Sequence, residues 1–91
     1  MADVGEGDDL LRTFAEISDF AEARAVAARH YDITEREAVQ TGLSAEIAKV
    51  LRRYVRDGLA ERYYGPRSCI YKPTPKARAF ALAADRGGEA A

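Results

Sequence analysis

The strongest constraint on the fold is a set of helix start and stop signals in the middle of the chain. Thr34 and Glu37 form a capping-box pattern, in which each side chain satisfies a free backbone amide in the first turn of a helix. This pattern predicts a short helix over 35–40. Gly42 follows where the turn requires a residue with positive φ, and Ser44 is expected to cap the next helix. The sequence therefore predicts two helices joined by a tight turn.

The second of these helices, predicted over 44–57 and ended by Gly58, is basic on its outer side. Apolar residues from Ile47 to Val55 recur at helical spacing and predict a buried side. Around that stripe the helix carries one acidic and four basic side chains: Glu46, Lys49, Arg52, Arg53 and Arg56. A short helix joined by a glycine-containing turn to a basic helix is the helix-turn-helix arrangement, whose second helix enters the major groove of DNA.

The remaining signals predict a mainly α domain with a small antiparallel β-hairpin. Stretches of β-type residues flank 65–68, a loop of hairpin length, and Thr74 with Pro75 predicts the start of a last helix. The apolar spacing over 9–30 fits one helix or two. In chain order, the expected parts are a flexible tail (1–7), the helical segment (9–30), the helix-turn-helix (34–57), the hairpin (59–73), a C-terminal helix (75–85) and a second flexible tail (87–91).

The charge distribution separates the chain into an acidic and a basic part. The net charge is −1, but residues 1–33 carry eight acidic residues and three Arg, whereas residues 34–78 carry ten Lys or Arg and five acidic residues. The basic part coincides with the predicted helix-turn-helix and hairpin. A sign asymmetry of this size indicates a basic working surface beside an acidic scaffold.

Composition and motif content argue against several classes of function. With one Cys and one His, the chain has no disulfide framework and no multi-cysteine zinc site, so neither a metal nor a cofactor is expected. No Gly-rich phosphate loop, paired-carboxylate site or nucleophile–base pair is recognisable, so the chain is not expected to be an enzyme. Its first residues are acidic and no apolar run approaches the ~20 residues of a membrane span, which predicts a cytoplasmic protein without a membrane partner.

Four segments together resemble a known family. They are 34–44, then 47–51, then 57–62 (Asp-Gly-Leu-Ala-Glu-Arg), then 71–76 (Tyr-Lys-Pro-Thr-Pro-Lys). This combination is similar to winged helix-turn-helix transcription regulators of the MarR-like, ArsR-like and PadR-like kind. The resemblance implies a single winged-helix domain over 8–86, in which the hairpin is the wing. Ala77 stands where the family often has Gly, and neither long dimerisation helices nor a cysteine-pair metal sensor is evident.

The resemblance also implies which residues contact DNA, with the basic helix in the major groove and the hairpin loop on the minor groove or the phosphates. Glu46 either accepts a hydrogen bond from a cytosine or only favours the helix N-terminus and pairs with Lys49. The three hairpin tyrosines are interpreted as core residues rather than as a stacking platform: Tyr63, Tyr64 and Tyr71. The residues expected to contact double-stranded DNA are Thr34, Arg36, Ser44, Ala45, Glu46, Lys49, Arg52, Arg53, Arg56, Arg67 and Lys72.

Regulators of this family are usually symmetric dimers on two half-sites, so a homodimer is expected. The terminal helices would supply its interface, because a small domain does not obviously bury all their apolar residues alone. The candidate interface residues are Leu10, Leu11, Phe14, Ile17, Phe80 and Leu82. Two other functions stay open, a winged-helix protein–protein adaptor and a DNA-binding protein of plasmid or viral replication or partition. The sequence names no effector ligand.

Overall fold

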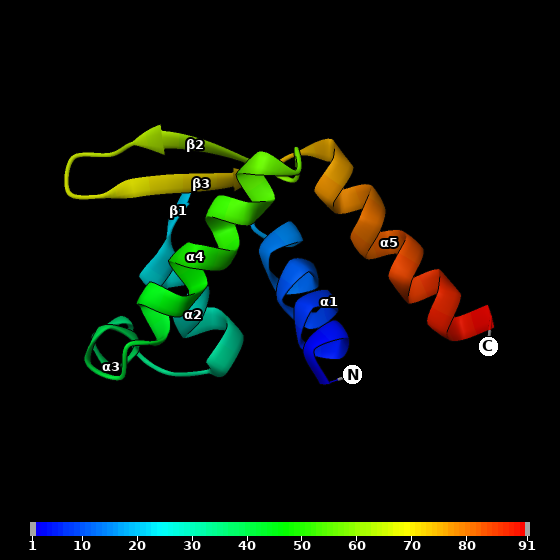
Figure 1. Cartoon of the computed structure of the whole chain (residues 1–91), viewed down its shortest axis with the longest axis horizontal. Coiled ribbons are helices and arrows are strands. Elements are labelled where there is room, and N and C mark those ends of the chain that lie inside the picture. The colour runs from blue at the N-terminus through cyan, green and yellow to red at the C-terminus, as the bar shows by residue number, and fades with distance from the viewer. Residues whose placement is uncertain (1, 91) are drawn as a thin grey trace.

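The computed structural model describes residues 9–83, and the bounds of the first and last helices extend past them. This part is mainly helical with a small three-stranded antiparallel sheet. The predicted tails (1–7 and 87–91) and the predicted end of the last helix at 85 lie outside the described residues. The elements, shown in Figure 1, are α1 (Ala2–Ala15), β1 (Ala21–Glu22), α2 (Ala23–Tyr31), α3 (Glu35–Gln40), α4 (Leu43–Arg56), β2 (Ala60–Tyr64), β3 (Cys69–Pro73) and α5 (Pro75–Ala90).

The segment over 9–30, which the sequence leaves as one helix or two, is two helices separated by a short strand. α1 ends at Ala15 and α2 begins at Ala23. Between them the Asp19 carboxylate accepts a hydrogen bond from the Phe20 amide at 2.8 Å, which turns the chain toward the sheet. α2 ends where Asp32 adopts a left-handed conformation with φ of 56°. The break removes Ile17 from the first helix.

The capping box at the start of α3 is confirmed. The Thr34 hydroxyl accepts from the Glu37 amide at 3.0 Å, and the Glu37 carboxylate accepts from the Thr34 amide at 3.1 Å. The predicted N-cap of α4 is wrong by two residues, because Gly42 and not Ser44 is the N-cap and the helix begins at Leu43. Gly42 has φ of 80°, and its carbonyl accepts from the Glu46 amide at 3.2 Å, so the helix has already begun before Ser44.

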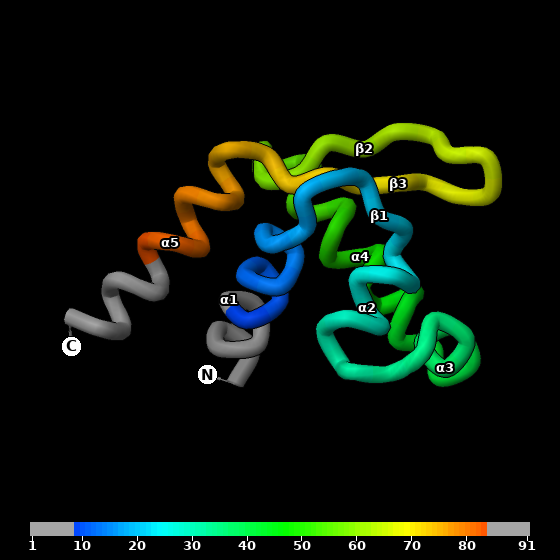
Figure 2. The backbone as a smooth tube through the Cα atoms, turned by 180° about the vertical axis from the view of Figure 1, so that it is seen from behind, coloured from blue at the N-terminus to red at the C-terminus, as the bar shows by residue number. Residues whose placement is uncertain are grey.

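The predicted hairpin is confirmed, and a third strand joins it. The strand order is β1-β3-β2, with both neighbouring pairs antiparallel. The backbone view in Figure 2 shows β1 beside β3, although they lie far apart in the sequence. Pairing of Ala21 with Tyr71 places the end of the α1–α2 connection against the hairpin. The hairpin is therefore fixed to the helical part along its central strand.

The core lies where α1, α2 and α4 meet under the sheet. Phe14, Val26 and Leu51 are completely buried there, and α4 packs mainly against α2. Ala38 of α3 is also completely buried, and its small side chain lets α3 approach the core closely. α5 packs on α1 and leaves one side to solvent. This arrangement leaves the long outer side of α4 uncovered.

The structure corrects the prediction of a dimer interface on the terminal helices. Leu10 and Phe14 belong to the core of the single chain, with exposed fractions of 6% and 0%. Leu11 and Ile17 are partly buried against that core. The prediction failed because one domain does bury these residues without a partner. The two other candidate residues remain strongly exposed on α5: Phe80 and Leu82.

Candidate nucleic-acid interface

The outer face of α4 is the side of the helix that the core leaves exposed. Ile47, Leu51 and Tyr54 are buried on the opposite side, so helical geometry turns the polar positions outward. Glu46 and Lys49 form an exposed ion pair at 3.5 Å on this face. A pair at this spacing contributes only about 0.2–0.5 kcal/mol, so it is easily exchanged for another partner. The outer face of α4 consists of Ala45, Glu46, Lys49, Arg52, Arg53 and Arg56.

Three arginines of this face have no partner within the described part of the chain. No carboxylate, carbonyl or aromatic ring pairs with Arg52, Arg53 or Arg56 among those residues. Only Arg36 of α3 shares this property among the described arginines. Arg24 and Arg29, by contrast, form ion pairs at 3.1 and 3.6 Å. An external anion would not have to break an internal ion pair to bind the three α4 arginines.

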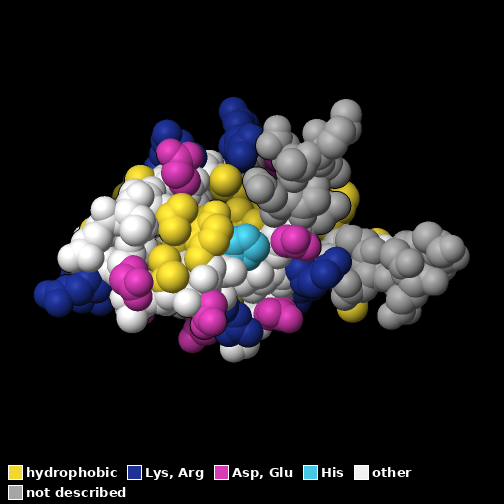
Figure 3. Space-filling view, turned by 90° about the horizontal axis from the view of Figure 1, so that it is seen from below, with side chains coloured by type: hydrophobic (Ala, Val, Ile, Leu, Met, Phe, Trp, Pro, Cys, Tyr) yellow, Lys and Arg dark blue, Asp and Glu magenta, His cyan; other side chains and the backbone are white. Residues whose placement is uncertain are grey.

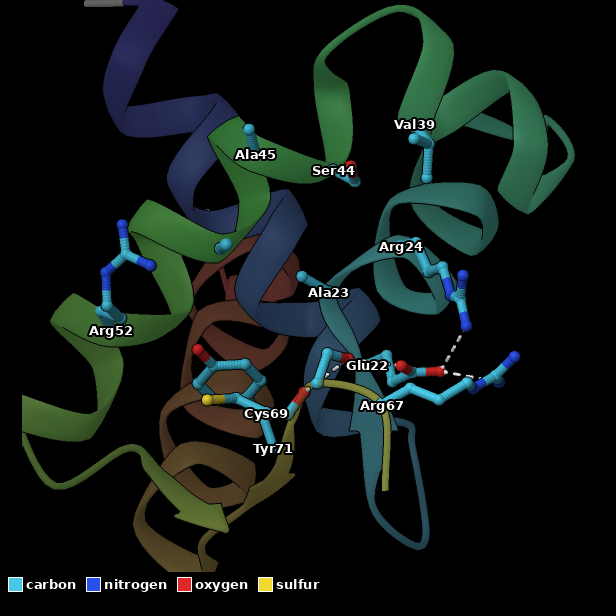
Figure 4. A pocket seen from close by; sticks show the side chains of 12 residues that line it. Glu22, Ala23, Arg24, Val39, Ser44, Ala45, Arg52, Arg67, Cys69 and Tyr71 are labelled. Carbon is cyan, nitrogen blue, oxygen red and sulfur yellow. Dashed lines mark hydrogen bonds and ion pairs between the residues drawn. The ribbon is translucent and has the colours of Figure 1, made fainter. Parts of the chain in front are cut away.

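An open groove of about 380 Å³ lies between α4 on one side and, on the other, β1, the start of α2, the hairpin loop and β3. Figure 4 shows Arg52 on the α4 side and Arg67 on the far side, with Tyr71 and Cys69 between them. Small side chains, among them Ala48, leave the groove open. Its lining includes four of the residues predicted to contact DNA: Ser44, Ala45, Arg52 and Arg67. The structure therefore brings the first turns of α4 and the hairpin loop (65–68) to one groove.

A carboxylate that the sequence analysis did not select lies at the hairpin side of this groove. Glu22 of β1 accepts hydrogen bonds from Arg24 at 3.1 Å, from Arg67 at 3.3 Å and from the Ser68 hydroxyl. Its side chain is 18% exposed. Arg24 also contacts Glu35 at 3.3 Å, which links this cluster to the start of α3. No local sequence signal could have found Glu22, because its partners in the hairpin lie 45 and 46 residues away.

These contacts keep Glu22 ionised. The hydrogen bond from Ser68, and after it the positive charges of Arg24 and Arg67, lower the pKa of the Glu22 carboxyl from its ordinary value of 4.5. Partial burial acts in the opposite direction and is outweighed. The hairpin loop is thus held by a carboxylate that stays ionised at lower pH than an unperturbed glutamate would.

The structure places Lys72 away from the outer face of α4. Cys69 and Tyr71 of β3 line the groove, so the alternation of side chains along a strand puts Ile70 and Lys72 on the distal face of the sheet. The Lys72 ammonium lies 5.3 Å from the centre of the Phe20 ring. Its predicted role beside the α4 residues is therefore not supported by its position.

Two of the three hairpin tyrosines are not core residues. Tyr71 is buried at 3% exposure as expected, but Tyr63 and Tyr64 are 46% and 84% exposed. Tyr63 packs edge-on against Phe20 on the distal face of the sheet, with ring centroids 4.9 Å apart. Its phenol donates to Glu61 at 2.7 Å, and this contact raises the pKa of Tyr63 above its ordinary 10.0. The prediction failed because the hairpin extends beyond the helices that could cover it.

Thr34 and Arg36 lie outside the groove. The Thr34 hydroxyl is occupied by the capping box, whereas Arg36 is exposed on α3. Figure 3 shows a different face, from below, where acidic and basic side chains surround an apolar area bordered by the histidine. His30 there lies 3.0 Å from the Thr13 hydroxyl. That face mixes both signs of charge, whereas the outer face of α4 carries four basic side chains and one acidic side chain.

Comparison with family models, with curated proteins and with solved structures finds no match for this chain. Over the described residues, no three His, Cys, Asp or Glu side chains gather as a metal site would need. Within the same part, none of the helices has the length and apolar character needed to cross a membrane. The charges and the geometry of the chain itself are therefore what indicates its function.

Proposed function

We propose that this chain is a winged helix-turn-helix protein that binds double-stranded DNA sequence-specifically and regulates transcription. The observation that carries the proposal is the set of three arginines without partners on the exposed side of α4. One of them, Arg52, lines an open groove whose far side presents Arg67. In this reading α3, the turn at Gly42 and α4 are the helix-turn-helix, and the β2–β3 hairpin is the wing.

The proposed docking follows from the dimensions of α4. Its 14 residues form a rod of about 21 Å, and the major groove of B-DNA admits one α-helix. Ser44, Ala45 and Glu46 in the first turns would face base edges, with Lys49 and Arg53 on bases or phosphates. Arg67 would reach the minor groove or the phosphates across the groove of the protein. Neutralised phosphates release counterions, which supplies affinity without sequence preference.

We further infer that the protein acts as a homodimer through α5. Phe80 and Leu82 are 55% and 57% exposed on this helix, at positions that lie on different sides of it. Exposed large apolar side chains are typical of association surfaces. A two-fold axis near α5 would present two α4 helices to two half-sites.

The test is a titration of the protein into labelled duplexes, one of random sequence and one from the region upstream of its own coding sequence, at two salt concentrations. We expect a roughly hundredfold or greater loss of affinity between about 50 and 200 mM salt, because several phosphate contacts are lost. Arg53→Ala should weaken binding to both duplexes. Arg29→Ala is the matched control, since it removes the same charge from α2. No binding at low salt, or equal losses in both variants, would contradict the proposal.

A protein–protein adaptor is the second candidate, and one observation favours it. Phe20 and Tyr63 form an exposed aromatic pair on the distal face of the sheet, away from α4. An adaptor that uses this pair would tolerate Arg53→Ala and lose its partner on Tyr63→Ala. A DNA-binding protein would instead lose affinity for DNA on Arg53→Ala and keep it on Tyr63→Ala.

A further inference from the structure

The hairpin loop (65–68) is closed by a backbone hydrogen bond across its base. The Gly65 amide donates to the Ser68 carbonyl at 2.9 Å, which closes the loop. A Cβ atom at Gly65 would lie 2.8 Å from that carbonyl oxygen, so only glycine fits there. The closed loop directs both Arg67 and Ser68 toward the Glu22 carboxylate of β1.

We propose that Glu22 is a positioning residue for the hairpin loop, and that its ion pair with Arg67 has to be exchanged for a DNA phosphate when the loop contacts DNA. This inference rests on the function proposed above. Glu22 holds the loop against β1 through Ser68 and holds the Arg67 guanidinium at 3.3 Å. The arginine that the loop presents is therefore partly neutralised before DNA arrives.

The geometry makes such an exchange feasible. The Arg67 side chain is 75% exposed while paired, so a phosphate can approach it without unfolding the loop. When Arg67 leaves, the Glu22 carboxylate still accepts from Arg24 and Ser68. The exchange therefore leaves no half-buried charge without a partner, which would otherwise be costly.

The pairing also has a direct consequence for affinity. An anion held next to Arg67 opposes the approach of a phosphate and has to give up its own contact when the phosphate binds. Glu22→Gln removes the charge and keeps an oxygen that can accept from Ser68 and Arg24. The matched control is Glu16→Gln, which removes a carboxylate paired with Arg29 at 3.6 Å and makes no contact with the loop.

The first experiment needs no DNA. Trypsin cleaves after Arg67 only when that side chain enters the protease, so the cleavage rate reports how firmly Glu22 holds it. We expect Glu22→Gln to accelerate cleavage at Arg67 by roughly two- to fivefold relative to cleavage at Arg62, as expected for loss of an exposed ion pair. Glu16→Gln should leave the ratio unchanged. An unchanged ratio in Glu22→Gln would overturn the inference, whatever the protein does with DNA.

The second experiment measures binding to a random-sequence duplex. We expect Glu22→Gln to raise affinity by roughly two- to tenfold at about 50 mM salt, and Glu16→Gln to have a smaller effect. In an Arg67→Ala background the gain should disappear. A gain that persists without Arg67, or a loss of affinity, would overturn the inference. If no variant and no wild-type protein binds DNA, the proposed function fails, whereas the protease experiment still decides whether Glu22 holds the loop.

Discussion

The rings of Phe14 in α1 and Tyr54 in α4 lie with their centroids 5.9 Å apart and their planes tilted by 33°. This contact joins the first helix to the inner side of the helix whose outer side carries the unpaired arginines. Phe14 is completely buried by it and by its neighbours. α1 therefore packs against the buried side of α4, opposite the outer face.

Phe14→Ala should strongly destabilise the protein. Removing a buried aromatic ring costs about 3–5 kcal/mol of unfolding free energy, because the lost contacts leave a cavity. Urea denaturation measures this change. Val39→Ala, at an exposed position of α3, is the control and should stay within about 0.5 kcal/mol of wild type. Equal effects of the two substitutions would show that Phe14 is not a core residue in solution.

Replacing both exposed apolar residues of α5 should abolish the proposed dimer. We expect Phe80→Ser with Leu82→Ser to sediment at the monomer mass of 10.0 kDa, while the wild type sediments at twice that value. Tyr63→Ser serves as the comparison, because it removes an exposed aromatic side chain from the sheet instead. A wild-type mass of one chain at tens of micromolar would rule out dimerisation through α5.

Lys72→Ala should affect DNA binding much less than Lys49→Ala. The two substitutions remove the same charge, but Lys72 lies over Phe20 on the distal face of the sheet, whereas Lys49 lies on the outer face of α4. Each phosphate contact that is lost lowers the slope of log affinity against log salt concentration by about 1 in magnitude. We expect this decrease in slope for Lys49→Ala and no decrease for Lys72→Ala. Similar slopes for both variants would place the DNA on a different surface.

Gly42→Ala should destabilise the fold through backbone strain alone. Gly42 has φ of 80°, and a Cβ atom there would have no neighbour within 4 Å. The cost is that of a left-handed conformation with a side chain, about 1 kcal/mol. Gln40→Ala, an exposed position at the end of α3, is the control in urea denaturation. If Gly42→Ala left the free energy of unfolding unchanged, the turn would be able to accommodate a side chain without strain.

The contribution of Glu22 to stability should fall in acid. Its pKa is lower in the folded protein than the ordinary 4.5, so the stabilisation is complete above that value and is lost as the pH falls through the folded pKa. The difference in unfolding free energy between wild type and Glu22→Gln should therefore be constant near neutral pH and shrink in acid. A difference that stays constant down to about pH 3 would contradict the depressed pKa.

Much of the helical part could be predicted because its signals are local. The capping box of Thr34 and Glu37 spans three residues, and the apolar stripe of α4 repeats every turn. The hairpin could also be predicted, because stretches of β-type residues flank a short loop over 65–68. The start of α4 was missed because Gly42 and Ser44 are both suited to the N-cap, and the backbone geometry of the turn decides between them.

The features that the sequence did not predict correctly depend on contacts between segments that are distant along the chain. β1 has two residues and exists only because β3 pairs with it. The same pairing brings Glu22 to Arg67, so local sequence patterns could not predict that Glu22 lines the groove. Lys72 was misplaced because a strand's two faces are assigned by register, which the sequence alone leaves undetermined.

The short strand β1 also bears on how the chain comes to be folded. The pairing of residue 21 with residue 71 closes a long loop, whereas the contacts within α3, α4 and the hairpin are local. During synthesis, Ala21 and Glu22 have no strand to pair with until β3 has left the ribosome. We therefore expect the helices to assemble first and the sheet to close last. The groove and the ion pair between Glu22 and Arg67 would then exist only after the hairpin has been synthesised.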